Sequence, residues 1–246
     1  RLGSAHVIVG VLVSASVKST MRLLETSGAE ATRARITLRD AQGNQKGSQA
    51  LEVPRYGMKS VDLASLSGGA TIAGGRVEIT VESGGGAIAG VATMLDPSRN
   101  GGATLVSQPI GGFVAPLSRA RRLNAATLTT VVAPVVLNGP QPSGDTVQTS
   151  MGFSSSGSKV SAVITWRPVD GQPVENSVEV LPNLTLHFDN VLEQLFGLAP
   201  GAKANGSIFI SGPGAELYVQ LLALVGGKWV PASTLPIFPT LSELMT

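Results

Sequence analysis

The sequence predicts an all-β protein built from two tandem immunoglobulin-like β-sandwich domains that are related by internal duplication. Three observations lead to this fold class. The segment ARITLRDAQG, residues 34–43, returns without a gap as AVITWRPVDG, residues 162–171. Charged residues make up 14% and aromatic residues 4% of the chain, which disfavours long salt-bridged helices. Short runs rich in β-branched residues also alternate with glycine-containing turns, as they do in sandwiches.

The repeated segment has the pattern of a β-strand that runs into a glycine turn. Ile36 and Leu38 alternate with Thr37 and Arg39, which places the two pairs on opposite faces of a strand. The repeat distance of 128 residues corresponds to whole domains, because solenoid units recur about every 20–50 residues.

The repeat distance also sets the expected domain boundaries. We expect a first sandwich at residues 1–110, a linker at 111–126 and a second sandwich at 127–246. The linker carries a run of arginines, which we interpret as a solvated basic segment.

Each copy is expected to contain seven or eight short strands. In the first copy these lie near residues 6–14, 20–26, 33–40, 48–53, 58–63, 75–82, 87–95 and 103–107. In the second copy they lie near residues 129–137, 146–153, 159–167, 175–181, 184–189, 205–211, 215–225 and 228–238. The breaks between strands are rich in glycine, asparagine, aspartate and proline, the residues that favour turns.

One segment of the second copy departs from the strand pattern. Apolar residues of NVLEQLFGL, residues 190–198, recur at helical spacing, and Asp189 is available as an N-cap. We expect a short helix there that crosses one end of the sandwich and buries Phe196. The corresponding segment of the first copy, residues 61–66, predicts a shorter element.

Composition and charge argue against several functional classes. The formal net charge of +2 is too small for a nucleic-acid footprint, so no nucleic-acid partner is expected. The absence of cysteine removes disulfides, thiolate metal sites and a cysteine nucleophile. The most apolar run, residues 5–17, has about half the length needed to cross a bilayer, so no transmembrane segment is expected.

The histidines give little support for catalysis or metal binding. The chain has two, His6 and His187, which the fold would have to bring together across 181 positions to form a metal site. His187 and Asp189 share a strand face, so a Ser/His/Asp arrangement is formally possible. However, GFSSSG, residues 152–157, does not match the nucleophile pattern G-x-S-x-G. We therefore interpret His187 as a surface histidine beside a helix cap.

The acidic residues also favour a non-enzymatic role. Glu78 and Glu82 share a strand face with Thr80, which could mimic the paired carboxylates of a glycosidase. Neither lies in apolar surroundings that would raise a pKa, so we expect solvent-facing charges. No glycine loop has phosphate-binding spacing, and we expect neither a cofactor nor an enzyme. The sequence leaves open a single surface Ca²⁺ site near Asp96 or Asp170.

The order of motifs in the second copy is more specific. APVVLNGPQPSGDTVQTSMGFSSSGSKVSAVITWRPVDG is followed by VEVLPNLTLHFDNVLEQLFGL and then by a strand pair ending KWVPAS. This order resembles the uncharacterised secreted tandem β-sandwich repeat modules of acidobacteria and related bacteria. The resemblance covers most of residues 131–232 and, more weakly, 5–110, and it implies extracellular sandwiches without catalytic residues. The strand DTVQTSMGF departs from the modules, many of which carry a tryptophan and an aspartate there.

The sequence thus predicts a non-enzymatic structural protein that is extracellular or at the cell surface, such as the self-assembling subunit of a filament, sheath or surface layer. The alternatives are an adhesion or ligand-binding module, an accessory domain of a larger secreted protein and a capsid-type double sandwich. Fold class alone does not decide among these.

The N-terminal run suggests how such a subunit would associate. Val7, Val9, Val11 and Val13 alternate with other, mostly apolar, residues, so both faces of the strand need cover. Because no domain precedes this run in the chain, we expect a neighbouring subunit to cover it. The result would be a head-to-tail homo-oligomer or homopolymer.

Overall fold

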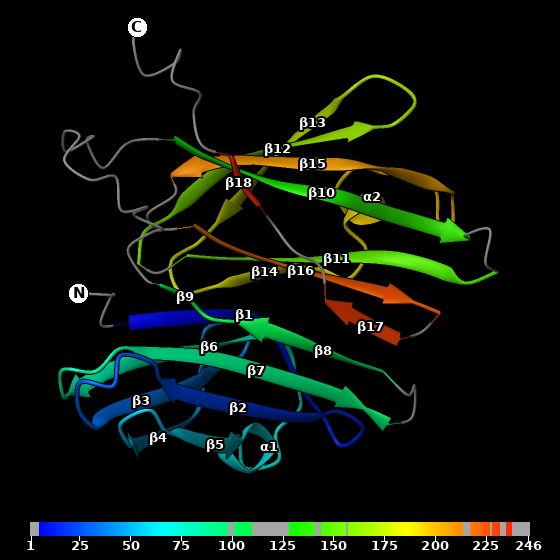
Figure 1. Cartoon of the computed structure of the whole chain (residues 1–246). Coiled ribbons are helices and arrows are strands. Elements are labelled where there is room, and N and C mark those ends of the chain that lie inside the picture. The colour runs from blue at the N-terminus through cyan, green and yellow to red at the C-terminus, as the bar shows by residue number, and fades with distance from the viewer. Residues whose placement is uncertain are drawn as a thin grey trace, which may run out of the picture.

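A computed structural model (Figure 1) describes residues 5–97, 101–109, 128–140, 144–155, 157–213, 217–226, 228–231 and 235–237. Within these residues the chain forms strands β1 to β18 and two four-residue helices, α1 and α2, so the predicted all-β sandwich class is confirmed. No helix in this part of the chain has the length and apolar character needed to cross a membrane.

The first half, drawn in blue to green in Figure 1, consists of two antiparallel sheets. Sheet 1A has the order β4-β3-β6-β1-β9 and comprises β1 (Ala5–Val13), β3 (Thr32–Arg39), β4 (Gln45–Val53), β6 (Ile72–Ser83) and β9 (Gln108–Pro109). Sheet 1B has the order β5-β2-β7-β8 and comprises β2 (Lys18–Glu25), β5 (Met58–Asp62), β7 (Ile88–Asp96) and β8 (Gly101–Val106). Helix α1 (Leu63–Leu66) connects β5 to β6.

The second half, drawn in green to red, repeats this plan. Sheet 2A has the order β13-β12-β15-β10-β18 and comprises β10 (Leu128–Pro140), β12 (Val160–Pro168), β13 (Val174–Val180), β15 (Ala204–Pro213) and β18 (Leu235–Ile237). Sheet 2B has the order β14-β11-β16-β17 and comprises β11 (Thr146–Ser155), β14 (Thr185–Phe188), β16 (Leu217–Val225) and β17 (Lys228–Pro231). Helix α2 (Val191–Gln194) follows β14. A short β10–β11 pairing joins 2A and 2B into one nine-stranded sheet.

Strand register also corresponds between the halves. Ile36 pairs with Ile79 in sheet 1A, and Ile164 pairs with Ile210 in sheet 2A. Ile36 and Ile164 are both fully buried, as the repeated segment predicts. The pairings define equivalent positions that are 128 residues apart between β2 and β11 and between β3 and β12, and 131 residues apart between β6 and β15 and between β7 and β16.

Each half has its own apolar core between its two sheets. Burial alternates along β3 and β12, so every second side chain enters the core, as expected for strands with one inward face. Leu38 and Ile79 lie in the first core, and Phe153 and Trp166 lie in the second. A fully buried side chain of this size stabilises the fold by about 1.5–3 kcal/mol.

The two halves pack against each other. The outer face of sheet 1A, around β1 and β6, contacts β11, β14 and β16 of sheet 2B, and β8 lies beside β17 (Figure 1). The backbone N–H of Thr185 donates to the carbonyl of Ala41 across this contact at 2.9 Å. Glycines allow the close approach, since a Cβ at Gly43 would lie 2.3 Å from the carbonyl oxygen of Asn183. The predicted linker, residues 111–126, lies outside the described residues.

Strands β4 and β13 are edge strands of sheets 1A and 2A. Both carry exposed charged residues: Lys46 and Glu52 on β4, and Glu175 and Glu179 on β13. Charges on an edge strand hinder its pairing with another chain.

Helix α2 is shorter than the sequence predicts. The N-cap is Asn190, whose side chain accepts from the N–H of Glu193, and not Asp189. The helix ends at Gln194, because Leu195 forms the C-cap and Gly197 takes a left-handed φ of 68°. The expectation of a shorter element at residues 61–66 is also wrong, since α1 has the same four-residue length as α2.

Phe196 is half-buried, and the expectation of full burial is therefore wrong. It lies beyond the last helical turn and packs against Trp166, with the ring centroids 5.8 Å apart. Helix α2 ends at Gln194, before Phe196, so it does not cover this side chain.

The strands near the C-terminus also differ from expectation. The predicted strand 228–238 is two strands, of which β17 pairs with β16 in sheet 2B and β18 pairs with β10 in sheet 2A. The two-residue strand β9, which pairs with β1, has no counterpart in the sequence prediction. Both β9 and β18 contain a proline, a residue tolerated at sheet edges.

One carboxylate holds three loops together at an end of the first sandwich. Glu25 accepts hydrogen bonds from the backbone N–H groups of Ser27, Gly28, Tyr56 and Ala87 at 2.8–3.2 Å, and from the hydroxyl of Ser27. The Ser27 hydroxyl, followed by the N–H of Tyr56, lowers the pKa of Glu25 to about 2. Glu25 therefore stays ionised and acts as a structural clamp.

Candidate functional site

The four valines predicted to mediate self-association are all buried inside the chain. Val7, Val9, Val11 and Val13 of β1 have exposed fractions of 3%, 0%, 0% and 1%. Val11 and Val13 point into the core of the first half, whereas Val7 and Val9 cluster with Tyr218 of β16. The cover that we expected from a neighbouring subunit therefore comes from the second half of the same chain.

A bulge in β1 explains why these valines face different ways. The register of β1 against β6 shifts between Val9 and Val11, where Gly10 takes a left-handed φ of 79°. Such a bulge changes which residues point to each side of a strand. Strict alternation, which the sequence prediction assumed, does not hold across Gly10.

Next to the Val7–Tyr218 contact lies a buried polar cluster that joins the halves. Arg76 of β6 is 2% exposed and reaches across to the second half. Its guanidinium donates to the Ser154 hydroxyl at 3.1 Å, to the Ser155 carbonyl at 3.3 Å and to the Asn183 side-chain oxygen at 3.4 Å. We call these residues, together with Glu78, the interface cluster.

Glu78 balances the charge of Arg76. One oxygen of its carboxylate lies 2.7 Å from a terminal nitrogen of Arg76, and the other accepts from Nε of Arg39 at 2.9 Å. Burial lowers the pKa of Arg76, and Glu78 opposes that shift. Arginine remains protonated in proteins even so, and a buried cation needs such a partner.

The interface cluster borders a small cavity of about 200 Å³. Its lining is completed by Val7, Arg39, Thr80 and Tyr218. Arg76 bonds across the contact to Ser154, Ser155 and Asn183, so the cluster serves to position the two sandwiches.

The two carboxylates considered as a glycosidase pair have separate structural partners. Glu82 bonds Nε of Arg33 at 3.1 Å and Nε of Arg35, while Glu78 bonds Arg39 and Arg76. The Arg35 hydrogen bond, followed by that of Arg33, lowers the pKa of Glu82. A general acid needs a raised pKa, so this geometry does not suit protonation of a glycosidic oxygen.

His187 lies between a serine and an aspartate, yet the geometry is not that of a catalytic triad. Its Nε2 is 3.3 Å from the Ser150 hydroxyl and 3.2 Å from the Asp189 carboxylate. A triad requires the serine and the carboxylate on opposite ring nitrogens. Ser150 is also only 1% exposed, so a substrate could not reach it.

The sequence suggested that His187 is a surface histidine, and this interpretation is wrong. Its side chain is 14% exposed and lies against Gly74 of the first half, where a Cβ would come within 2.9 Å of the His187 Cβ. His187 thus belongs to the contact between the halves. His6, by contrast, lies beside Ser107 within the first half.

His187 is expected to make stability depend on pH. Burial lowers its pKa, and Asp189 offsets this only in part. The unfolded chain therefore takes up a proton more readily than the folded chain, so the free energy of unfolding should fall as pH drops through about 6.5. In chemical denaturation at pH 7.5 and pH 5, the fall should be smaller in His187→Gln, which retains His6. Equal falls in both proteins would contradict the assignment.

Among the residues that the structure describes, no group of three or more His, Cys, Asp or Glu side chains could hold a metal ion. Asp96 is buried and Asp170 is exposed in the β12–β13 turn, so the open Ca²⁺ positions gain no support from their surroundings.

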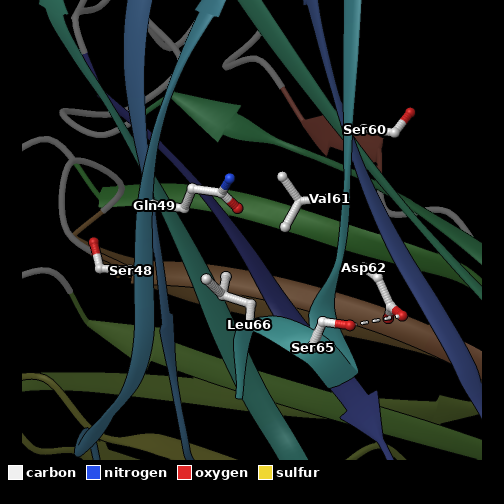
Figure 2. A pocket seen from close by; sticks show the side chains of 7 residues that line it. All are labelled: Ser48, Gln49, Ser60, Val61, Asp62, Ser65 and Leu66. Atoms are coloured by element: carbon white, nitrogen blue, oxygen red, sulfur yellow. Dashed lines mark hydrogen bonds between the residues drawn. The ribbon is translucent and has the colours of Figure 1, made fainter. Parts of the chain in front are cut away.

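A shallow groove of about 370 Å³ lies between the edge strands β4 and β5 and helix α1 (Figure 2). It is lined by Ser48, Gln49, Ser60, Val61, Asp62, Ser65 and Leu66. Asp62 caps α1 through the N–H of Ala64 and also accepts from the Ser65 hydroxyl at 3.2 Å. The groove offers hydroxyl and amide groups to a polar ligand. At the position equivalent to Gln49, Asn176 instead donates to the carbonyl of Leu195.

The GFSSSG segment has a role that the sequence did not reveal. Ser154 and Ser155 are buried in β11 and bind Arg76, so they belong to the contact between the halves and not to an active site. Arg76 itself drew no attention in the sequence, since arginines are mostly exposed.

No protein-family model matches the chain, and no curated protein matches it. The resemblance to secreted modules of acidobacteria stays a prediction.

Proposed function

We propose that the protein is a non-enzymatic structural protein of the cell exterior, built by duplication of one sandwich and able to assemble into a filament, sheath or surface layer. The observation that carries the proposal is that the side chains most capable of chemistry are engaged in structural contacts. Arg76, Glu78, Ser154 and His187 all take part in the contact that joins the halves. The side chains best suited to chemistry therefore contribute to architecture.

Two further observations support the proposed origin and location. The halves share strand order and register over sheets 1A and 2A and over 1B and 2B, which is what duplication would produce. The motif order of the second half resembles secreted modules that occur in tandem, which favours an extracellular or cell-surface location.

A concentration series on the purified chain tests the assembling role. Light scattering and electron microscopy should show particles that grow with concentration far beyond the 25.1 kDa of one chain. A protein that stays monomeric throughout the series would refute this role.

The groove of Figure 2 supports a second candidate, a binding or adhesion module. It is open and lined by hydroxyl and amide groups, whereas Asn176 bridges the equivalent region of the second half. For this candidate, a panel of sugars and short peptides should shift the melting temperature of the wild type but not of Gln49→Ala. A panel without effect on the wild type would argue against it.

A further inference from the structure

The cavity of about 200 Å³ beside the interface cluster is bounded by both halves of the chain. Strands β1, β3 and β6 line one side, and β11, β16 and the turn before β14 line the other. Ligand sites are common where two domains meet, because side chains from separate scaffolds converge there. Pockets for drug-sized ligands span about 300–1,000 Å³, so this cavity suits a smaller molecule.

The residues that line the cavity differ in their exposure to solvent. Arg76 and Ser154 are buried, whereas Thr80 and Asn183 are exposed. The cavity therefore has a buried inner end at Arg76 and Ser154 and a mouth at Thr80 and Asn183. A small molecule that enters at the mouth would place its leading polar group near the guanidinium of Arg76.

The charges that line the cavity do not cancel. Two guanidinium groups, those of Arg39 and Arg76, face one carboxylate, that of Glu78. The two oxygens of Glu78 lie 2.7 Å from Arg76 and 2.9 Å from Arg39, so this carboxylate is shared between both cations. Neither arginine forms an ion pair with any other acidic side chain in the described part of the chain. One positive charge is therefore left over at the contact between the halves.

Arg76 also retains an unused hydrogen-bond donor. One of its terminal nitrogens binds Ser154 and Ser155. The other terminal nitrogen binds Asn183 and Glu78. Its Nε, in contrast, is buried and has no hydrogen-bond partner among the residues that the structure describes. Buried donors without a partner are rare in folded proteins, and one explanation for them is a water molecule or an ion that binds there.

A monovalent carboxylate fits these features better than water or a multivalent anion does. Water would satisfy Nε of Arg76 but would leave the surplus charge uncompensated, and a dianion would reverse the sign of that charge. A carboxylate has two acceptor oxygens that match the planar donors of a guanidinium. The hydroxyl of Thr80 and the side-chain nitrogen of Asn183 are able to donate further hydrogen bonds at the mouth.

We propose that the cavity between the halves binds a small monovalent carboxylate, which directs its charged group toward Arg76 and compensates the surplus charge of Arg39 and Arg76. Glu78 has the same sign of charge as the ligand, but both of its oxygens are held by guanidinium groups. The bound ligand would contact both sandwiches and would stabilise the folded chain by mass action. This site does not depend on the proposed assembling function.

Heteronuclear NMR spectroscopy of the whole chain tests the proposal with acetate as the probe. Sodium acetate replaces sodium chloride at constant ionic strength, so that general screening of charges does not change. The Nε–H signal of Arg76 and the backbone amide signals of Thr80 and Asn183 should shift together and reach saturation. Inorganic phosphate should bind more weakly. Signals that stay unchanged would overturn the proposal in favour of water, and tighter binding of phosphate would overturn the choice of a carboxylate.

Arg39→Gln removes the surplus charge and leaves Arg76 paired with Glu78, so it should weaken acetate binding by about tenfold or more, as expected for the loss of a charged partner. Arg35→Gln is the matched control, because Arg35 lies on the same strand and binds Glu82 but does not line the cavity. It should bind acetate as the wild type does, and equal weakening in both variants would overturn the site.

Thr80→Glu keeps the test decisive if Arg39→Gln does not fold. Thr80 is exposed, so a longer side chain can be accommodated there, and the added carboxylate lies at the mouth of the cavity. The saturable shift of the Arg76 signal should disappear in this variant. Acetate binding of wild-type strength in Thr80→Glu would contradict the proposed site.

Discussion

Glu78→Gln is expected to lower the free energy of unfolding by about 3–5 kcal/mol, the range for removing one partner of a buried ion pair. The substitution leaves the guanidinium of Arg76, which is 2% exposed, without its carboxylate at the contact between the halves. Urea denaturation followed by circular dichroism measures the loss.

Glu82→Gln is the matched control for this prediction. Glu82 lies on the same strand and also binds two arginines, but Arg33 and Arg35 are 56% and 46% exposed. Exposed ion pairs contribute about 0–1 kcal/mol, so the control should lose much less. Similar losses in the two variants would mean that Arg76 does not depend on Glu78.

Phe153→Ala is expected to cost about 3–5 kcal/mol, as for other fully buried aromatic residues. Phe153 is 0% exposed in the core of the second half and meets Phe188 edge to face, with the ring centroids 6.0 Å apart. Removal of the ring leaves a cavity between sheets 2A and 2B. Thermal and chemical denaturation both report the change.

Phe196→Ala provides the comparison within the same half. Phe196 is half-buried against Trp166, so the same deletion should cost clearly less than at Phe153. The opposite ranking would contradict the arrangement of the helix and core.

Most of the strands could be predicted because their signal is local. Alternation of apolar and polar residues marks β3 and β12, and glycine marks the turns that follow them, with φ values of 81° at Gly43 and 121° at Gly171. The equivalent burial of Ile36 and Ile164 follows from the repeated segment alone.

The contact between the halves could not be predicted because its partners are distant in the sequence. Arg76 and Ser154 are 78 positions apart, and nothing near either residue indicates the other. The bulge at Gly10 was missed for a different reason. An apolar run with both faces covered has no polar residue to reveal where the alternation shifts.

The Glu25 clamp was missed for a third reason. Its donors come from three loops that meet only after the sheets have paired, so the sequence around Glu25 shows a carboxylate at a strand end and nothing more. Loop convergence of this kind is a property of the tertiary structure.

The charged edge strands β4 and β13 would protect closely packed copies of the chain from conversion into cross-β aggregates. In a filament, sheath or surface layer of the proposed kind, many copies would lie close together, a condition in which unprotected strands convert to cross-β aggregates. Lys46 and Glu52 on one edge, and Glu175 and Glu179 on the other, would oppose backbone pairing between neighbouring copies. Assembly of folded copies would then stay separate from amyloid formation, and dilution should return such an assembly to folded single chains.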